Sequence, residues 1–215
     1  MTPNKEDYLK CIYELGNQDF KVTNKLIAEV MGVSAPATSE MMKKLLADNF
    51  IEKDKVKGYK LKGTSMAIVS DLVRKHRLIE LFLFNHLGYT FEQVHAEAEV
   101  LEHVVSDLFV DKLEHILGYP RICPHGGIVP RKEEILEELI AYPLDKVTVG
   151  QSYRIKRVID NIDLLRYLEN NHLKIGTEFF FSEKDDFTGI YTISLGTQSI
   201  QMTHAVAKQI YVDAV

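Results

Sequence analysis

The run HAEAEVLEH is the most specific chemical pattern in the sequence. On a helix that turns by ~100° per residue, Glu99, Glu102 and His103 share one face within about 60° of arc, and His95 lies one turn before Glu99, whereas Glu97 points away. Two carboxylates and an imidazole packed this closely repel or desolvate one another. Because a divalent cation removes that penalty, the run predicts a helix that binds metal.

A second stretch, HRLIE, repeats the spacing, since His76 and Glu80 are also four residues apart. Each pair by itself has an ordinary alternative, a surface contact worth about a few tenths of a kcal/mol. Two such pairs, bordered by the apolar runs LIELFLF and VVSDLFV, favour metal binding over that alternative. With carboxylate and imidazole donors and no thiolate in the HAEAEVLEH run, a hard or borderline ion such as manganese fits better than zinc or copper(I).

Composition and charge limit the class of protein. With 215 residues and 46% hydrophobic content, the chain can bury a sizeable core. Its two cysteines, Cys11 and Cys123, are too few for a disulfide framework, and the sequence has neither a secretion signal nor an apolar run of ~18 residues. We therefore expect a cytoplasmic protein with no membrane partner. The net charge is -5, yet the first 63 residues carry 11 lysines against 9 acidic residues, so this basic part is where a nucleic acid would bind.

Three domains are predicted, mainly α with small β elements. They are a winged helix-turn-helix DNA-binding domain (1–63), a helical metal-binding and dimerisation domain (64–142) and a small β-barrel (143–215). The middle domain should contain two periodic helices, the loop GYPRICPHGGIVP and a short acidic helix from Arg131 to Ala141. The runs VTVGQSYRI, TEFFFSE, GIYTISL and SIQMT indicate the barrel.

Two short helices joined at Gly32 and Val33 have the spacing of a helix-turn-helix. Thr23 is expected to cap the first helix and Ser34 the second, which carries Pro36 in its first turn, where the missing N–H is not needed. The small residues at the start of the second helix allow close approach to base edges and phosphates. Its inward face is expected to consist of Met41, Leu45 and Leu46.

The lysine-rich run EKDKVKGYKLK predicts a β-hairpin wing, with Gly58 at the turn and Val56, Tyr59 and Leu61 alternating. A lysine-rich hairpin can also be no more than a solvated edge strand, and any helical domain has caps. The helix-turn-helix spacing followed directly by a basic hairpin favours DNA binding over that alternative. The expected DNA contacts are Thr23, Ser34, Ala35, Pro36, Thr38, Ser39, Lys43, Lys57, Tyr59 and Lys60.

Together these motifs resemble the diphtheria-toxin-repressor family of metalloregulators, in its manganese-sensing branch and especially the streptococcal type. The resemblance covers essentially the whole chain and rests on EDYLKCIYEL, the winged helix, HRLIE, HAEAEVLEH and CPHGGIVP. It implies a C-terminal SH3-like, FeoA-like domain and a primary manganese site made of Asp7, Glu99, Glu102 and His103. Iron-sensing relatives have Met and Cys at the positions of Asp7 and Glu99. Other manganese regulators have a carboxylate where this chain has Lys10, whose charge repels a second ion in that pocket.

The resemblance also implies a second metal site that the C-terminal domain helps to complete. Its candidate ligands are His76, Glu80, His95, Cys123, His125 and Asp160. The alignment at the C-terminal domain needs a one-residue gap and also admits Asp163. A loop cysteine is often a bystander, but if Cys123 is a ligand the site should accept Zn2+, Cd2+ or Fe2+. Cys11 continues a buried stripe beside Ile12 and is expected in the core.

By this resemblance the chain is expected to repress metal-uptake genes as a homodimer on double-stranded operator DNA, with no small organic substrate. Manganese should fix the two winged helices relative to each other, and LIELFLFNHLG and VVSDLFV should form the twofold interface. Two alternatives remain open: a metal-dependent hydrolase that uses the His/Glu cluster, and a constitutive winged-helix protein with a structural metal. The sequence contains no H-E-x-x-H helix, nucleophile elbow or phosphate loop, so no enzyme is expected.

Overall fold

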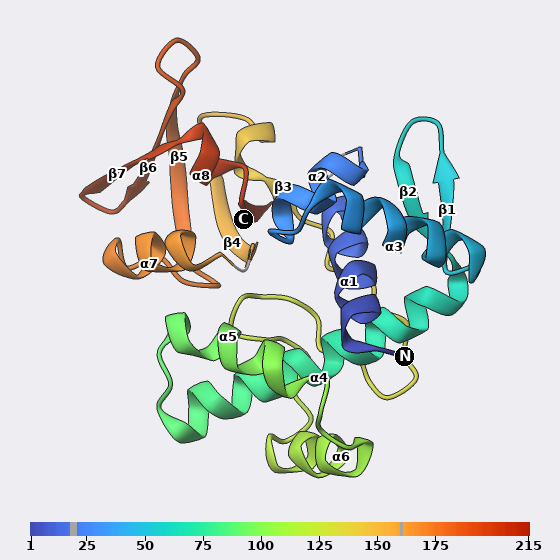
Figure 1. Ribbon diagram of the computed structural model, residues 1–215. Helices are drawn as coiled ribbons and strands as arrows, with labels where there is room; N and C mark the ends of the chain where they lie inside the picture. The colour runs from blue at the N-terminus through green and yellow to red at the C-terminus, as the bar shows by residue number, and fades with distance from the viewer. Residues whose placement is uncertain (18–20, 160) are drawn as a thin grey trace. The chain divides into compact units, whose positions relative to one another are not determined.

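The computed structural model describes residues 1–17, 21–159 and 161–215 (Figure 1). They form two compact units. The first unit consists of Met1–Arg77, Leu101–Ser106 and Pro130–Glu137, and the second of Leu78–Val100, Asp107–Val129 and Glu138–Val215. The domain boundaries after residues 63 and 142 remain predictions.

The helices are α1 (Pro3–Asn17), α2 (Asn24–Val30), α3 (Ala35–Ala47), α4 (Gly63–Leu87), α5 (Phe91–Leu101), α6 (Asp107–Ile116), α7 (Ile162–Asn170) and α8 (His204–Ala207), with a 3-10 turn η1 (Leu144–Lys146). The strands are β1 (Ile51–Asp54), β2 (Gly58–Leu61), β3 (Tyr142–Pro143), β4 (Ser152–Val158), β5 (Glu178–Asp185), β6 (Ile190–Leu195), β7 (Gln198–Thr203) and β8 (Ile210–Ala214). No helix in the described part of the chain is both long and apolar enough to span a bilayer.

The predicted caps of the helix-turn-helix are confirmed. The Thr23 hydroxyl accepts a hydrogen bond from the backbone N–H of Leu26 at 3.2 Å, and the Ser34 hydroxyl accepts one from Ala37 at 3.3 Å. Pro36 lies in the first turn of α3. Because each capping side chain satisfies a donor that the helix leaves unpaired, α2 and α3 begin where the sequence predicts.

The inward face of α3 agrees with the prediction at Leu45 only. Met42 and Leu45 are buried, whereas Met41 and Leu46 are only partly buried. Thr38, one turn before Met42, is completely buried as well. Apolar periodicity does not include the polar Thr38, whose burial moves the stripe to positions 38, 42 and 45.

The predicted wing is present as β1 paired antiparallel with β2. Gly58 is the first residue of β2, has φ +82°, and would bring a Cβ to 2.1 Å from the carbonyl oxygen of Val22. The backbones lie this close because the Val22 N–H donates to the Lys57 carbonyl at 2.9 Å and the Tyr59 N–H donates to the Val22 carbonyl at 3.0 Å. Glycine is therefore required where the wing docks against the residue before the Thr23 cap.

Three helices, α4, α5 and α6, lie between the wing and the GYPRICPHGGIVP loop, where the sequence predicts two periodic helices. Leu78, Ile79, Leu81 and Leu83 of the LIELFLF run are buried within the single chain. These four side chains pack inside the protomer, whereas Leu87 of the same LIELFLFNHLG run is 56% exposed. The twofold interface on LIELFLFNHLG and VVSDLFV stays a prediction. The large apolar side chains exposed in the VVSDLFV run are Val104, Leu108 and Phe109.

The acidic run from Arg131 to Ala141 is not helical, contrary to prediction. Glu133 has φ +65°, and the backbone N–H of Leu136 donates to the Ser70 hydroxyl at 2.8 Å. Leu136 is also buried. The Ser70 hydroxyl of α4 thus accepts the Leu136 N–H, which a helix would need for its own hydrogen bond. Burial of Leu136 outweighs the helix propensity of the acidic residues.

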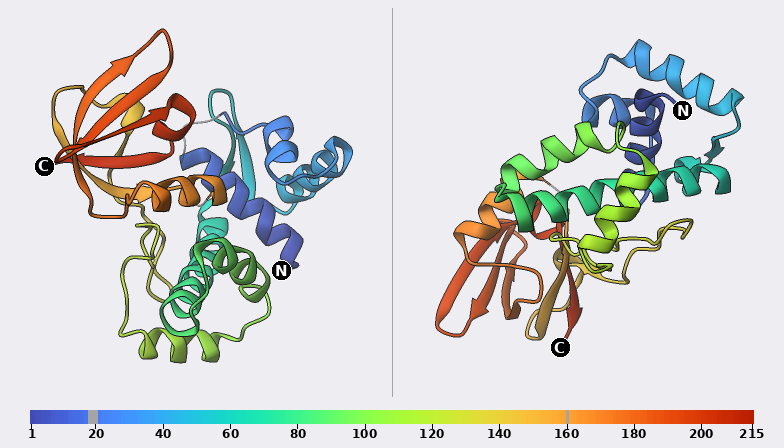
Figure 2. Two further views of the ribbon diagram at one scale, coloured as in Figure 1. Left: turned by 90° about the vertical axis from the view of Figure 1, so that its left-hand side faces the viewer. Right: turned by 90° about the horizontal axis from the view of Figure 1, so that it is seen from below.

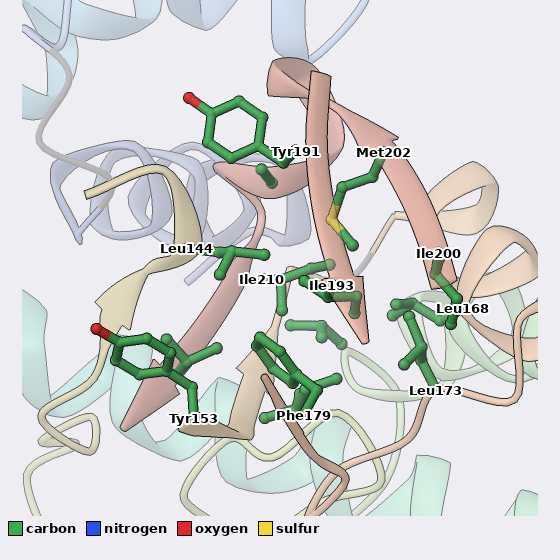
Figure 3. Close-up of a cluster of buried hydrophobic side chains, with 14 of the residues drawn as sticks. Leu144, Tyr153, Leu168, Leu173, Phe179, Tyr191, Ile193, Ile200, Met202 and Ile210 are labelled. Atoms are coloured by element: carbon green, nitrogen blue, oxygen red, sulfur yellow. The ribbon is translucent and has the colours of Figure 1, made fainter. Parts of the chain in front are cut away.

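The predicted C-terminal strands are confirmed in a six-stranded sheet of order β3-β8-β4-β5-β6-β7, in which all neighbours are antiparallel. One hydrophobic cluster fills its buried side, as Figure 3 shows. α7, which the sequence interpretation missed, contributes Leu164, Leu165 and Leu168 to this cluster and lies beside the sheet in both views of Figure 2. Strand members of the cluster include Tyr153, Phe179, Phe181, Ile193 and Met202.

Candidate metal centre

Three of the predicted primary ligands meet in the first compact unit. Asp7 comes from α1, while Glu102 and His103 directly follow α5, and one ligand atom of each lies within 4.8 Å of the others. The distance from Asp7 Oδ1 to His103 Nε2 is 2.8 Å, and from Glu102 Oε1 to the same nitrogen it is 3.6 Å. Two carboxylates and an imidazole nitrogen thus converge, a donor set that suits a hard or borderline divalent ion.

The electrostatics of this cluster fit such an ion. Burial raises the pKa of Asp7 above its ordinary value, and the negative charge of Glu102 acts in the same direction, while His103 opposes both. Ionised Asp7 is therefore held in surroundings that disfavour its charge. The charge of a divalent ion would offset the desolvation and the repulsion together, so the residues present fit a metal site.

Glu6 is a functional candidate that the sequence interpretation missed. Its Oε2 lies 2.8 Å from His103 Nδ1, while the other ring nitrogen faces Asp7. When Nδ1 donates its proton to Glu6, the lone pair of Nε2 is directed toward the ligand side. The one available signal is the adjacent pair of carboxylates in EDYLK, but neighbours on a helix point ~100° apart, so the pattern alone does not bring both to one ring.

Lys10 is buried against the same cluster. Its Nζ lies 3.1 Å from each carboxylate oxygen of Glu102 and 3.3 Å from His76 Nδ1, and His76 Nδ1 also pairs with Glu102. Burial alone would raise the pKa of Glu102, but His76 and Lys10 outweigh it and leave that pKa below its ordinary value. The structure thus brings His76, a predicted secondary ligand, to a primary-site carboxylate.

Glu99 belongs to the second compact unit. Its Oε1 lies 3.3 Å from His95 Nε2, one helical turn away, and its side chain is 56% exposed. The role of Glu99 as a primary ligand stays a prediction. Glu97 is exposed, in agreement with its place on the other side of the helix.

A second candidate cluster lies in the second compact unit. Glu80 of α4 and the loop residues Cys123 and His125 each offer a ligand atom within 4.8 Å of the others, and all three residues are buried. Glu80 Oε2 lies 3.5 Å from His125 Nδ1, and Glu80 Oε1 lies 3.7 Å from His95 Nδ1. Four predicted secondary-site residues therefore come together, and their thiol, imidazole and carboxylate donors suit a borderline ion such as zinc.

The loop that carries Cys123 is shaped by its own backbone. Cys123 N–H donates to the Gly127 carbonyl at 2.9 Å, and Gly126 N–H donates to the Cys123 carbonyl at 3.0 Å. Gly126 has φ +82°, and a Cβ there would lie 2.0 Å from the Lys156 carbonyl oxygen of β4. Only glycine allows this approach, and the tight turn explains how two donors two residues apart face one glutamate.

Two candidate carboxylates and one cysteine predicted for the core remain. Asp160 lies outside the described residues. Asp163 has a side chain that is 89% exposed and lies 3.5 Å from the Arg166 guanidinium. Cys11 is in the core as predicted, and burial raises the pKa of its thiol to about 12.

The predicted DNA contacts are mostly accessible, with one correction. Thr38 is completely buried, where its hydroxyl donates to the Ser34 carbonyl at 3.2 Å and accepts from the Tyr8 hydroxyl at 3.4 Å. The prediction of Thr38 as a DNA contact is therefore wrong, because this small polar residue packs inside the domain. The exposed members of the predicted set are Ser34, Ala35, Pro36, Lys43, Lys57 and Lys60, while Thr23, Ser39 and Tyr59 are partly buried.

The tip of the wing is organised by Asp54, a residue that the sequence interpretation missed. Its Oδ1 accepts hydrogen bonds from the backbone N–H groups of Val56 and Lys57, both at 2.8 Å, and its Oδ2 accepts one from Lys60 Nζ at 3.1 Å. The backbone bond from Lys57, then those from Lys60 and Val56, lower the pKa of Asp54 to about 2. A carboxylate thus holds two predicted phosphate-binding lysines at the tip.

Three family models match successive parts of the chain. Residues 1–59 match the N-terminal DNA-binding domain of iron-dependent repressors, and residues 63–131 match the metal-binding and dimerisation domain of the same repressors. Residues 142–214 match the FeoA domain. The matches agree with the DNA-binding, helical and SH3-like character predicted for the three parts.

Individual relatives extend these matches to full length. The structure of the manganese regulator SloR has 53% identity and a TM-score of 0.90, with 100% of each chain covered. The structure of ScaR with bound Zn2+ has 52% identity and a TM-score of 0.91, with 99% of this chain and 100% of that one covered.

Curated relatives agree at lower identity. The HTH-type transcriptional regulator MntR of Oceanobacillus iheyensis is 30% identical over 118 residues, which are 55% of this chain and 80% of MntR. The diphtheria toxin repressor of Corynebacterium jeikeium is 32% identical over 61% of this chain, and the match spans only 55% of that repressor's length. The chain belongs to the diphtheria-toxin-repressor family of metal-dependent, DNA-binding transcriptional repressors.

Proposed function

We propose that this chain is a manganese-dependent repressor that binds operator DNA as a homodimer and controls metal-uptake genes in the cytoplasm. The observation that carries the proposal is the convergence of Asp7, Glu102 and His103, which links α1 to a segment far downstream in the sequence. The hydrolase alternative has no support, because the matching family consists of repressors and not of enzymes.

α1 is the element through which this cluster would act on DNA binding. It packs against α2 and β2, so a bond that restrains α1 also restrains the helix-turn-helix and the wing. A bound manganese ion would supply the positive charge that lets Asp7, Glu102 and His103 stay together, and Glu6 would hold the His103 ring in place. The residues of the cluster would then keep α1 in one position.

Restraint of α1 matters because a dimeric helix-turn-helix protein must present two recognition helices about one DNA turn, ~34 Å, apart. A protomer with mobile reading elements meets that spacing only part of the time, and metal binding favours the competent form. Raising the competent fraction from about 1% to about 99% takes roughly 5.5 kcal/mol of differential binding. Four protein ligands, with Glu99 as the fourth, supply enough interactions for this.

Manganese is the favoured ion for the primary site because its donors are carboxylates and an imidazole. The likeness to the manganese regulator SloR supports the same ion. We propose the Glu80, His95, Cys123 and His125 cluster, with Asp160 as a further ligand, as a second metal position. It would also accept Zn2+, Cd2+ or Fe2+, and the ScaR structures with bound Zn2+ and with bound Cd2+ support that range.

The DNA interface is proposed at the start of α3 and along the wing. Small exposed residues of α3 would approach the bases, and the wing lysines would contact phosphates. The proposed contacts are Thr23, Ser34, Ala35, Pro36, Ser39, Lys43, Lys57, Tyr59 and Lys60.

A gel-shift titration tests the metal dependence, with an operator duplex selected from random-sequence DNA by the manganese-loaded protein. Wild type should bind about 100-fold more tightly in micromolar manganese than in EDTA, a ratio within the usual range of coupling between sites. Glu102→Gln should lose most of this gain, because the amide removes a charged ligand. Glu99→Gln tests the ligand that lies in the second compact unit.

Glu97→Gln is the matched control, since Glu97 is an exposed carboxylate of the same helix and should leave the gain unchanged. Equal wild-type affinity in EDTA and in manganese would point to a constitutive DNA-binding protein with a structural metal instead.

A further inference from the structure

Lys10 is an unusual residue to find in a protein core. It is only 8% exposed, and its ammonium contacts both oxygens of Glu102, which is itself 2% exposed. Lysine is almost never this buried unless it is paired. The position therefore needs a reason beyond the filling of space.

The Lys10 contacts join the same segments that the metal ligands join. Lys10 lies on α1, three residues after Asp7, and Glu102 lies next to His103, so the ammonium bridges 92 residues of sequence between them. His76 of α4 adds a third segment, 3.3 Å from the Lys10 ammonium. Segments that a metal ion would hold together are thus already connected by a protein cation.

We propose that Lys10 is a metal-free tether: its ammonium holds α1 against Glu102 before metal binds, and thereby sets how tightly the metal-free repressor binds DNA and how large the metal response is. This inference rests on the proposed function. Lys10 brings one positive charge and engages Glu102 and His76, whereas a divalent ion would engage Asp7 and His103 as well as Glu102. The ammonium is therefore the weaker of the two tethers.

Charge balance supports a tether over simple packing. The carboxylates of Glu6 and Asp7 on α1 and of Glu102 all lie close to the His103 ring, so negative charge is concentrated beside Lys10. Removing one partner of a buried ion pair leaves the other charge uncompensated, which strongly destabilises the arrangement that contains it. Loss of the Lys10 charge should hence release α1 from Glu102 when no metal is present, and a divalent ion should restore the link.

Hydrogen exchange and gel shift on the full-length dimer test this inference, with EDTA or manganese chloride as the only addition. In EDTA, Lys10→Gln should increase exchange of the α1 backbone amides by about tenfold and weaken operator binding by a similar factor, within the usual range of coupling. In saturating manganese both values should return to within about twofold of wild type. Lys10→Arg, which keeps the charge, should resemble wild type under both conditions.

Lys5→Gln is the matched control. Lys5 also lies on α1 and pairs with Asp48 at 2.6 Å, but both side chains are partly exposed, so its loss should leave α1 exchange in EDTA unchanged. If Lys10→Gln folds only when manganese is present, the tether is supported, because the metal replaces the ammonium. If Lys10→Gln matches Lys5→Gln in EDTA, or fails to fold with manganese as well, the inference is overturned.

The same data separate this inference from the proposed function. A wild-type protein whose operator affinity does not respond to manganese contradicts the proposed function. The difference in α1 exchange between Lys10→Gln and Lys5→Gln in EDTA still tests the tether in that case, because it requires neither metal nor DNA.

Discussion

At the scale of single residues, carboxylates do two different jobs in this molecule. Asp7 faces the His103 imidazole and a second carboxylate in a partly desolvated cluster, where a divalent ion would stabilise its charge. Asp54 instead faces donors: two backbone N–H groups and the ammonium of Lys60. The same functional group is thus a candidate metal ligand in one place and an organiser of the DNA-binding wing in the other, and only its neighbours make the difference.

The titration of Asp54 provides a test at this scale. Its pKa is lowered from 3.8 to about 2, so its bonds stabilise the folded wing above pH ~4, and that contribution is lost as the pH falls from 3.8 towards 2. The amide NMR shifts of Val56 and Lys57, which donate to Asp54, should follow the titration of this carboxyl, with a midpoint at a pH of about 2. Asp54→Asn should remove the transition, and a wild-type midpoint at or above 3.8 would contradict the proposed wing tip.

At the scale of elements, contacts with residues distant in the sequence modify what local patterns predict. The run from Arg131 to Ala141 loses its helix where Leu136 is buried and bonds to Ser70. The wing keeps its predicted hairpin but adds a contact with Val22, which the hairpin pattern does not contain. Local propensity therefore holds unless a buried side chain or a neighbouring backbone offers more.

Gly58 provides a test of the wing as an element. Gly58→Ala should lower the free energy of unfolding by about 2–3 kcal/mol, because it combines a positive φ with a Cβ 2.1 Å from the Val22 carbonyl oxygen. Gly32→Ala is the matched control, with φ +65° but no atom within 4 Å of its Cβ, and should cost only about 1 kcal/mol. Urea unfolding measures both, and equal losses would show that the contact with Val22 is not needed.

At the scale of the whole molecule, α6 carries large apolar side chains that are exposed in the protomer, among them Leu108 and Phe109. The family model that matches residues 63–131 describes a dimerisation domain. We infer that the twofold interface includes the exposed apolar side chains of α6, with Leu108 and Phe109 among them.

Leu108→Glu tests this interface. Leu108 is 68% exposed in the protomer, so the protomer should fold normally, but a charge buried in the interface should raise the dimer dissociation constant at least about tenfold. Sedimentation velocity over a concentration series measures the change. Phe187→Glu is the control, since Phe187 is 97% exposed at the turn between β5 and β6 and should leave the dimer intact. Equal dissociation constants for the two variants would move the interface elsewhere.

Features that depend on local spacing could be predicted from the sequence alone. Caps at Thr23 and Ser34, the lysine-rich hairpin and the C-terminal strands all follow from turn, helix or strand periodicity over a few residues. The ordered His/Glu pairs also follow from helical periodicity, and together with the resemblance to a known family they indicated the metal site.

Contacts between side chains far apart in the sequence depend on the tertiary fold and could not be predicted in this way. The fold places Lys10 on Glu102 across 92 residues and Glu6 on His103 across 97, and it buries Thr38 against Tyr8 of α1. The physical reason is that burial and charge pairing depend on three-dimensional neighbours, which no local period encodes. The candidate ligands could thus be predicted from the sequence. The contacts that Lys10 and Glu6 make with them could not.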